Sequence, residues 1–277
     1  SFLPTTSGDK NIDAVLAGSD FWWKNSNATA TKSATQIAPN VFQIDPSQSK
    51  HTLTYSWLKG TESYLSAKDK AQFQAMDTNQ KKAVKDALGY LSSIVNVSFT
   101  ETNDTASANV LYGTNNQNGV SGGYANYPNG NGGNPSTLLL ANDGGSGTAN
   151  SGANLGTQGG YGWETLIHEI GHTMGLKHPG NYNAGGGGTS GPYLPAALDN
   201  RRMSIMSYKD PSPSRTLNVS VTQGGYSWSM SNVNPTTYGV FDIAAMQYLY
   251  GANKNTNAAN MTLTDTFADF KTVWAPK

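Results

Sequence analysis

The sequence predicts an α+β domain, and three observations support this fold class. Several short segments alternate between apolar and polar residues, as strands of a half-buried sheet do. Residues 77–95 form an amphipathic helical pattern, and a second helix beginning near Tyr161 carries two of the chain's four histidines. Because the order is strand, helix, strand, strand, strand, we expect a mostly covered sheet with helices packed against it.

The first strand and helix have the clearest signals. Residues 51–58, HTLTYSWL, alternate and predict a strand. In the segment 77–95, Asp77 or Thr78 is placed to cap the helix start. Its apolar residues recur at helical spacing, at Ala83, Val84, Ala87, Leu88, Leu91 and Val95.

The later elements follow from the same patterns. Four further segments predict strands, at residues 95–101, 108–114, 121–128 and 136–142. Glycine, asparagine and serine dominate residues 142–160, which predicts a loop, and residues 180–200 are again irregular. Residues 241–251 predict another helix, which ends at Gly251. The last 26 residues show no convincing pattern.

Composition excludes several classes of protein. The 277 residues include no cysteine, so a disulfide framework and a thiolate metal site are both excluded. Lysine plus arginine equals aspartate plus glutamate, at 18 each, which predicts no nucleic-acid or membrane-surface partner. No run of 18 apolar residues occurs, so no membrane span is expected. A surface rich in amides and hydroxyls, with 13% charged residues, indicates an extracellular protein.

The start of the chain carries no secretory leader. It begins at Ser1, without a basic and then apolar segment. We therefore expect a processed or trimmed chain, exported through a leader already removed or through a signal that lies elsewhere.

The stretch HEIGHTMGLKHPG, residues 168–180, carries the chemistry. Residues four apart share one face of a helix, so His168 and His172 would direct both imidazoles to one point. Glu169 would project beside that point. Gly175 can adopt the left-handed conformation that ends a helix, which would return His178 to the same point. Three nitrogen ligands with a fourth position open are typical of a catalytic zinc ion.

The chain also resembles a known family of zinc proteases. The segment SIMSY, residues 204–208, follows the histidines as the methionine-containing turn does in the metzincins. Within that group the chain resembles the serralysins, which are secreted bacterial proteases. The resemblance covers most of the chain. The matching segments are HEIGHTMGLKHPGNYNAG, DNRRMSIMSY from Asp199, DIAAMQYLYGAN from Asp242 and, more loosely, the N-terminal NIDAVLAG and the tryptophan after it.

The resemblance implies a role for each matching residue. The implied zinc ligands are His168, His172 and His178. Glu169 would be the general base and then the proton shuttle. Tyr208 would be a further zinc ligand at rest, and would then move away and donate a hydrogen bond to the oxyanion.

Met206 has a structural role by either argument. The resemblance makes it an apolar floor beneath the imidazoles. From chemistry alone, a methionine in such a turn is more often a core residue than a ligand. Both arguments make Met206 a support.

The segment GGYANYP resembles the edge strand that borders the cleft in these proteases. A substrate peptide can add to such an edge through main-chain hydrogen bonds. The candidate substrate-binding residues are Gly123, Tyr124, Ala125 and Asn126. For any single side chain among them, an ordinary edge strand is an equal alternative.

The expected domain organisation also comes from the resemblance. Residues 1–250 would form a catalytic domain, with an N-terminal subdomain to about residue 178 and an irregular C-terminal subdomain bordering the cleft. Serralysins continue into a calcium-binding β-roll, of which this chain contains no repeat. We expect residues 251–277 to be a tail or the stub of a missing β-roll, a fragment being favoured over a shorter relative. Calcium would belong to that C-terminal domain outside this chain.

The sequence therefore predicts a secreted, extracellular zinc endopeptidase that acts on proteins or peptides. A monomer is expected, and a proteinaceous inhibitor is a further partner that the resemblance allows. One alternative is a metzincin-fold binding module without catalysis, although neither Glu169 nor any ligand histidine is lost. The other is a protease of another metzincin subfamily. The segment HPG at the third histidine and the position of Tyr208, two residues after Met206, argue against most of these subfamilies.

Overall fold

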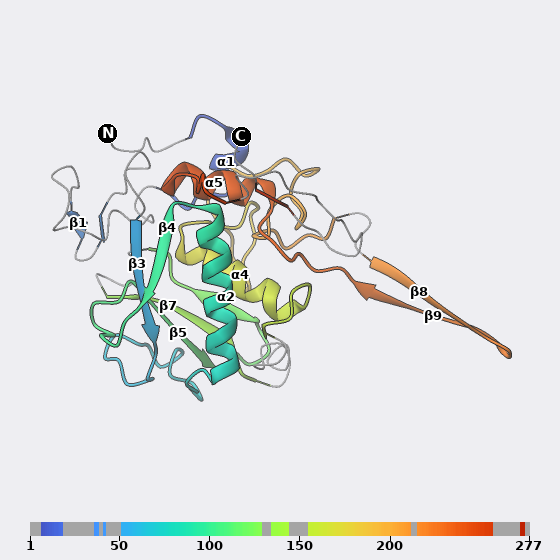
Figure 1. Ribbon diagram of the computed structural model, residues 1–277, viewed down its shortest axis with the longest axis horizontal. Coiled ribbons are helices and arrows are strands. Elements are labelled where there is room, and N and C mark those ends of the chain that lie inside the picture. Colours follow the sequence, from blue (N-terminus) through green and yellow to red (C-terminus); the bar gives the residue numbers. More distant parts are fainter. Residues whose placement is uncertain are drawn as a thin grey trace.

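A five-stranded sheet forms the centre of the fold, in the strand order β4-β3-β5-β7-β6 (Figure 1). β3 runs parallel to β4 and to β5, and β5 runs parallel to β7. At the edge, β6 runs antiparallel to β7. The strand bounds are His51–Trp57 for β3, Val97–Glu101 for β4, Val110–Asn115 for β5, Gly123–Ala125 for β6 and Ser136–Ala141 for β7.

The computed structural model describes residues 7–18, 36–38, 41–42, 51–128, 134–143, 155–211, 215–256 and 272–274. Part of the predicted loop 142–160, the tryptophans after NIDAVLAG and most of the predicted tail lie outside these residues. Among the described residues, no helix has the length and apolar character needed to cross a membrane.

Three longer helices pack with the sheet. The helix α2 (Thr78–Ile94) starts in a capping box, in which the Asp77 carboxylate accepts from the Gln80 amide at 2.8 Å. The helix α4 (Tyr161–Thr173) crosses behind it in Figure 1, and α5 (Val240–Tyr250) lies across the end of both. A short helix, α1 (Lys10–Asp13), precedes them near α5.

Both faces of the sheet are buried. Alternate residues of β5 and β7, such as Tyr112, Leu138 and Leu140, pack in one cluster with α2, α4 and α5. Their neighbours Leu111 and Leu139 pack on the opposite face in a second cluster. Parallel strands that are covered on both sides lose the alternation of a half-exposed sheet, which is why all six residues of β7 (STLLLA) are buried.

The predicted elements agree closely with the structure. The helix predicted for 77–95, the helix near Tyr161 and the helix at 241–251 are all present, as are the five strands. The strand predicted for 121–128 is shorter, since β6 covers only residues 123–125, although Gly122 and Asn126 on either side still form backbone hydrogen bonds with β7. The α+β fold class is confirmed, and the division of the chain at residues 178 and 250 stays a prediction.

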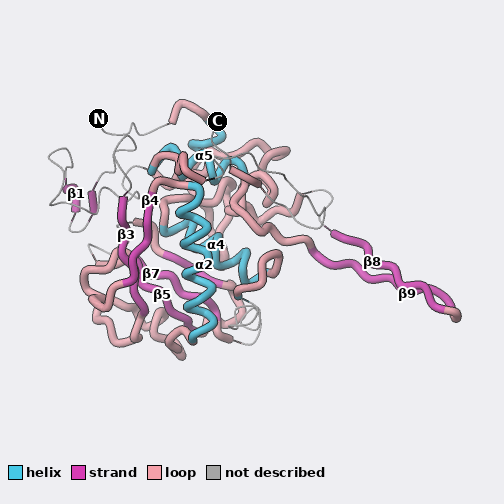
Figure 2. The backbone as a smooth tube through the Cα atoms, in the orientation of Figure 1, coloured by secondary structure: helices cyan, strands magenta, loops and turns pink. Residues whose placement is uncertain are grey.

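Elements outside this core were not predicted. They are α1, the short pair β1 (Gln36–Ala38) and β2 (Val41–Phe42), and the hairpin of β8 (Arg215–Thr222) and β9 (Gly225–Asn232). Figure 2 shows the hairpin extending away from the rest of the protein, and loops making up most of the chain between α4 and the hairpin. The hairpin has a local signal that was missed, since LNVSV and YSWSM both alternate.

Candidate metal centre

The centre is built on the C-terminal half of α4. His168 and His172 lie four residues apart on this helix, and their ring centroids are 4.9 Å apart. One side of α4 packs in the core through Leu166, Ile167 and Ile170, each at most 1% exposed. That packing fixes the rotation of the helix about its axis, and therefore the side on which the histidines project.

A glycine turn brings the third histidine back to the helix. Gly175 has φ of 97°, the left-handed conformation predicted from the sequence. After the turn, Leu176 forms a β-bridge with Leu16, and the Lys177 amide donates to the Val15 carbonyl at 2.8 Å. The N-terminal segment thus pairs with the residues immediately before His178 and sets the direction from which His178 approaches.

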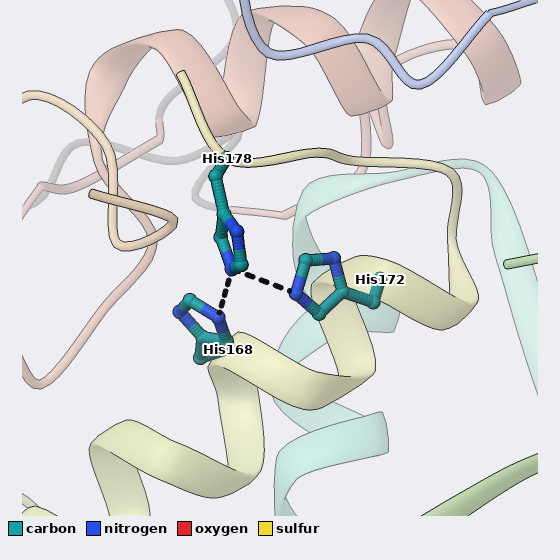
Figure 3. Close-up of side chains that lie close together, drawn as sticks. All are labelled: His168, His172 and His178. Atoms are coloured by element: carbon teal, nitrogen blue, oxygen red, sulfur yellow. Dashed lines mark hydrogen bonds between the residues drawn. The ribbon is translucent and has the colours of Figure 1, made fainter. Parts of the chain in front are cut away.

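The three imidazoles converge on one point (Figure 3). The Nε2 atom of His178 lies 3.2 Å from Nε2 of His168 and 3.1 Å from Nε2 of His172. These residues form a group whose ligand atoms lie within 4.8 Å of one another. Zinc–nitrogen bonds of about 2.0–2.1 Å at tetrahedral angles place nitrogens roughly 3.3 Å apart, so the spacing suits this ion.

The hydrogen bonds of the Nδ1 atoms, which point away from the meeting point, determine which ring nitrogen carries the hydrogen. Nδ1 of His168 donates to the Ile205 carbonyl at 2.9 Å, and Nδ1 of His172 donates to the Leu176 carbonyl at 2.8 Å. Nδ1 of His178 lies 3.1 Å from the Tyr182 carbonyl and 2.7 Å from Asn183 Oδ1. Since carbonyl oxygens can only accept, each Nδ1 carries the hydrogen and each Nε2 presents a lone pair.

Three lone pairs directed at one another cannot form hydrogen bonds among themselves. A cation at their meeting point would satisfy all three, and the outer hydrogen bonds are those that orient metal-binding histidines. Burial keeps the rings neutral: it lowers the pKa of His168 to about 3, and it also lowers the pKa of His172 and of His178. Neutral imidazole is the form that binds zinc, so the residues fit this metal.

Glu169 lies beside the histidines and is available for chemistry. Its side chain is buried, and its Oε2 atom has no hydrogen-bond partner among the described residues. Burial raises the pKa of Glu169 to about 8. A Cβ atom added to Gly123 would lie 2.9 Å from Cγ of Glu169, so the edge strand β6 packs directly against this side chain.

The turn that contains Met206 supports α4 from the other side. Met206 is fully buried, and a Cβ atom at Gly171 would approach its Sδ atom to 2.8 Å. The glycine between the two helical histidines therefore allows the turn to lie against the helix backbone. This contact agrees with the supporting role expected for Met206.

Tyr208 lies at the rim of the centre. Its ring centroid is 4.5 Å from that of His178 and 4.9 Å from that of Tyr182. Its hydroxyl accepts from the Ala184 amide at 3.2 Å, and the side chain is 39% exposed. Burial of the ring raises the pKa of the Tyr208 hydroxyl to about 12. The tyrosine is thus next to the histidines, and its role as a zinc ligand stays a prediction.

With this geometry in place, comparisons with known proteins become informative. The model of the family described as "Metallo-peptidase family M12" (Reprolysin_5) matches residues 30–220, which contain the histidine helix and the methionine turn. The chain belongs to metallo-peptidase family M12. Membership of a metallopeptidase family confirms the predicted class of enzyme and implies zinc as the metal.

Individual M12-type relatives support the resemblance to the serralysins. The chain is 33% identical over 240 residues to metallopeptidase AprA of Pseudomonas marginalis, covering 84% of this chain and 47% of that protein. It is 38% identical over 122 residues to serralysin C of Dickeya chrysanthemi, covering 40% of this chain and 22% of the relative. The chain thus spans about half the length of AprA.

Among solved structures, the chain is similar to high choriolytic enzyme 1, a hatching enzyme zinc-protease from Oryzias latipes. The likeness has a TM-score of 0.39 and 14% sequence identity, and covers 91% of this chain and all of that one. Overlap at this level adds nothing to the family assignment.

In this M12 domain the histidines lie between two hollows that share Glu169, Gly123 and Tyr208. One, of about 470 Å³, extends past His168. The other, of about 500 Å³, extends past His172 and His178. Together they make a groove along β6 that passes on both sides of the histidines.

The predicted substrate-binding residues differ in what they present to this groove. Gly123, Tyr124 and Ala125 form β6 and border one or both hollows. The Tyr124 hydroxyl donates to Asp69 at 2.7 Å and accepts from Asn115 at 2.8 Å, so it is already engaged. The Asn126 amide oxygen accepts from Thr137 of β7. Any contribution of this strand to binding therefore falls mainly to its backbone.

Two charged residues in the first hollow were missed from the sequence. Glu164, one turn before His168, is 5% exposed, and its Oε1 pairs with Arg201 Nε at 3.1 Å. Its Oε2 has no partner among the described residues. Burial raises the pKa of Glu164 to about 7, while Arg201 opposes the shift. An acid on the buried side of an amphipathic helix is the signal that would have identified it.

Proposed function

We propose that this chain is the catalytic domain of a secreted zinc endopeptidase that cleaves peptide bonds in protein substrates. The observation that carries the proposal is the convergence of three Nε2 lone pairs beside a buried, unpartnered carboxylate. His168, His172 and His178 would hold the zinc ion. When bound, zinc lowers the pKa of a water molecule and polarises a carbonyl group.

The residues of the chain supply the proton transfers. Burial raises the pKa of Glu169, and the positive charge of a bound zinc ion would oppose that shift and favour the carboxylate. As a carboxylate, Glu169 would accept a proton from the attacking water and return it to the leaving amine. A carboxylate withdrawn from solvent, with one oxygen that accepts no hydrogen bond, is suited to this exchange because no competing donor has to be displaced. Tyr208, which by the family resemblance would be a further zinc ligand at rest, would donate its hydroxyl hydrogen to the oxyanion during the reaction.

The substrate chain lies extended along β6. A strand at the edge of a sheet offers backbone amides and carbonyls to an incoming peptide. The position of Gly123 over Glu169 places that edge next to the proposed base. A peptide paired with β6 would present its scissile carbonyl between the histidines and Glu169.

The proposal is tested by zinc content and digestion of casein. We expect about one zinc ion per chain and proteolysis that is lost on chelation. The variant Glu169→Gln should retain zinc and lose two to four orders of magnitude in rate, the usual effect of removing a general base. The control is Glu101→Gln on β4, at the opposite edge of the sheet from β6. If Glu169→Gln digests casein at the parental rate, the proposed mechanism is wrong.

A further inference from the structure

The hairpin of β8 and β9 carries a continuous apolar face outside the catalytic centre. Three cross-strand pairs lie directly opposite each other along it: Leu217 with Met230, Val219 with Trp228, and Val221 with Tyr226. Since alternate residues of a strand project to the same side, these six side chains share one face. They are open to solvent, with Val221 82%, Tyr226 75% and Trp228 63% exposed.

The opposite face of the hairpin is polar and uncharged. It carries hydroxyls and amides, and Asn218 donates to Ser231 across the strands at 3.0 Å. From residue 216 to residue 241 the sequence contains no aspartate, glutamate, lysine or arginine. Residues 216–241 therefore offer a partner no charged group to recognise.

An isolated hairpin of this kind does not account for its own stability. Two strands alone are marginally stable in water, and a third strand or a packed face is normally needed. Here the hairpin extends away from the sheet and helices (Figures 1 and 2), and every described side chain on it is exposed. Apolar surface gathered on one side of such an extension usually marks an interface.

We propose that this face binds the same face of a second copy of the chain. The aromatic side chains of Tyr226 and Trp228 can each remove roughly 150–250 Å² from water. With the four other apolar side chains, the face approaches the roughly 800 Å² that each partner contributes to an interface of standard size. The two hairpins would pack as two layers about 10 Å apart, related by a twofold axis. The six apolar side chains carry no charge. The one charged residue on the same side is Arg215, the first residue of β8, at the base of the hairpin, and an antiparallel pairing would keep the two copies of Arg215 at opposite ends.

The near absence of charge on the hairpin also favours a second copy of the chain over a membrane surface or a different protein. Segments that lie on membrane surfaces usually combine an apolar face with several lysines and arginines, whereas the two strands of this hairpin contain Arg215 alone. Different proteins that recognise one another usually present complementary charges. Strands of eight residues extend roughly 26 Å, which leaves room for two catalytic domains with both grooves open. The proposal departs from the monomer expected from the sequence.

Sedimentation velocity over a range of concentrations tests the proposal. The full chain should sediment as a dimer of 29.3 kDa subunits. The double variant Val219→Lys/Trp228→Lys places two charges in the middle of the face and should weaken dimerisation on the order of 10²-fold or more, as removal of a central aromatic anchor does. The matched control is Asn218→Lys/Ser229→Lys, the adjacent cross-strand pair on the polar face. It adds the same charges and should remain dimeric.

Two further measurements keep the test decisive. If the double variant does not fold, Val221→Lys replaces the most exposed side chain of the face and should still weaken the dimer, with unchanged caseinolytic activity per chain. A parent chain that remains monomeric at every accessible concentration overturns the proposal. A monomer that co-sediments with phosphatidylcholine vesicles also overturns it and assigns the face to a lipid surface. The proposal is equally overturned if the control variant is as monomeric as the variant of the apolar face.

Discussion

The carboxylate of Asp242 accepts the amide hydrogen of Ile205 at 2.6 Å. The carbonyl of the same Ile205 accepts from Nδ1 of His168 at 2.9 Å, so the two ends of one residue connect α5 to a proposed zinc ligand. Asp242 also accepts from the Ser204 hydroxyl at 2.6 Å and from the Gly239 amide at 2.8 Å. A fully buried acid thus holds the methionine turn in the position that orients His168.

The variant Asp242→Asn should weaken both the fold and zinc binding. One oxygen becomes an amino group, so the side chain loses its charge and one acceptor. If the amide oxygen keeps the Ile205 and Gly239 amides, the amino group faces the Ser204 hydroxyl, which must then accept instead of donate. At pH 7 we expect a loss of about 1–3 kcal/mol in the free energy of unfolding, and a loss in zinc affinity of roughly 10–100-fold. Urea unfolding and chelator competition measure the two effects. The control Asp86→Asn, on the exposed side of α2, should change neither appreciably.

The same residue predicts a dependence of stability on pH. Burial raises the pKa of Asp242 to about 6, from an ordinary value of 3.8. Between pH 4 and pH 6 the folded state retains a proton that the unfolded state has lost, so stability falls as pH rises through this window. The total fall from this group is up to about 3 kcal/mol. The stability difference between the parent and Asp242→Asn, both free of metal, should therefore shrink from pH 4 to pH 7. A constant difference would contradict the prediction.

Gly171 and Gly89 should respond oppositely to the same substitution. An alanine at Gly171 would press against the buried Met206, which should destabilise the fold by about 1–3 kcal/mol. Gly89 is an exposed position in α2 with nothing within 4 Å of an added Cβ, so Gly89→Ala should stabilise by up to about 1 kcal/mol. Thermal melts of the two variants show whether each substitution raises or lowers the melting temperature. Stabilisation by both would show that the turn does not pack against α4 as described.

Zinc should stabilise the folded chain without any need for calcium. A ligand that binds only the folded state adds about 2.7 kcal/mol at a free concentration 100 times its dissociation constant. In calcium-free buffer we expect one cooperative melt, a lower midpoint after chelation, and recovery with zinc. In the control His172→Ala, the midpoint should barely respond to zinc. A chain that stays unfolded until calcium is added would refute the prediction.

Tyr208→Phe should lower turnover while sparing the fold. Phenylalanine keeps the ring against His178 and Tyr182 but cannot donate to an oxyanion. Loss of one such donor costs about 10²–10³ in kcat, with a smaller change in KM because the contact belongs mainly to the transition state. Steady-state kinetics on one peptide substrate provide the measurement, and Tyr193→Phe, at an exposed hydroxyl, is the control. Near-parental turnover would reduce Tyr208 to a packing residue.

The local parts of this protein could be predicted from the sequence. The spacing of His168 and His172 is a property of one helix, and Gly175 needs only its own φ to end that helix. The amphipathic period of α2 and the capping position of Asp77 also lie within a few residues of one another. The hairpin was missed although its signals are equally local: both strands alternate, and Gly224 and Gly225 lie at the turn between them.

The long-range parts were decided by tertiary packing. Nothing near residue 164 in the sequence indicates that Glu164 pairs with Arg201, and nothing near residue 242 indicates that its carboxylate holds Ile205. The sheet order β4-β3-β5-β7-β6 is likewise not the order of the chain. Helix period, caps and turns depend on neighbours in the sequence, so a short pattern determines them. Which buried acid meets which amide depends on how several surfaces fit together at once, and only the folded chain brings those surfaces into contact.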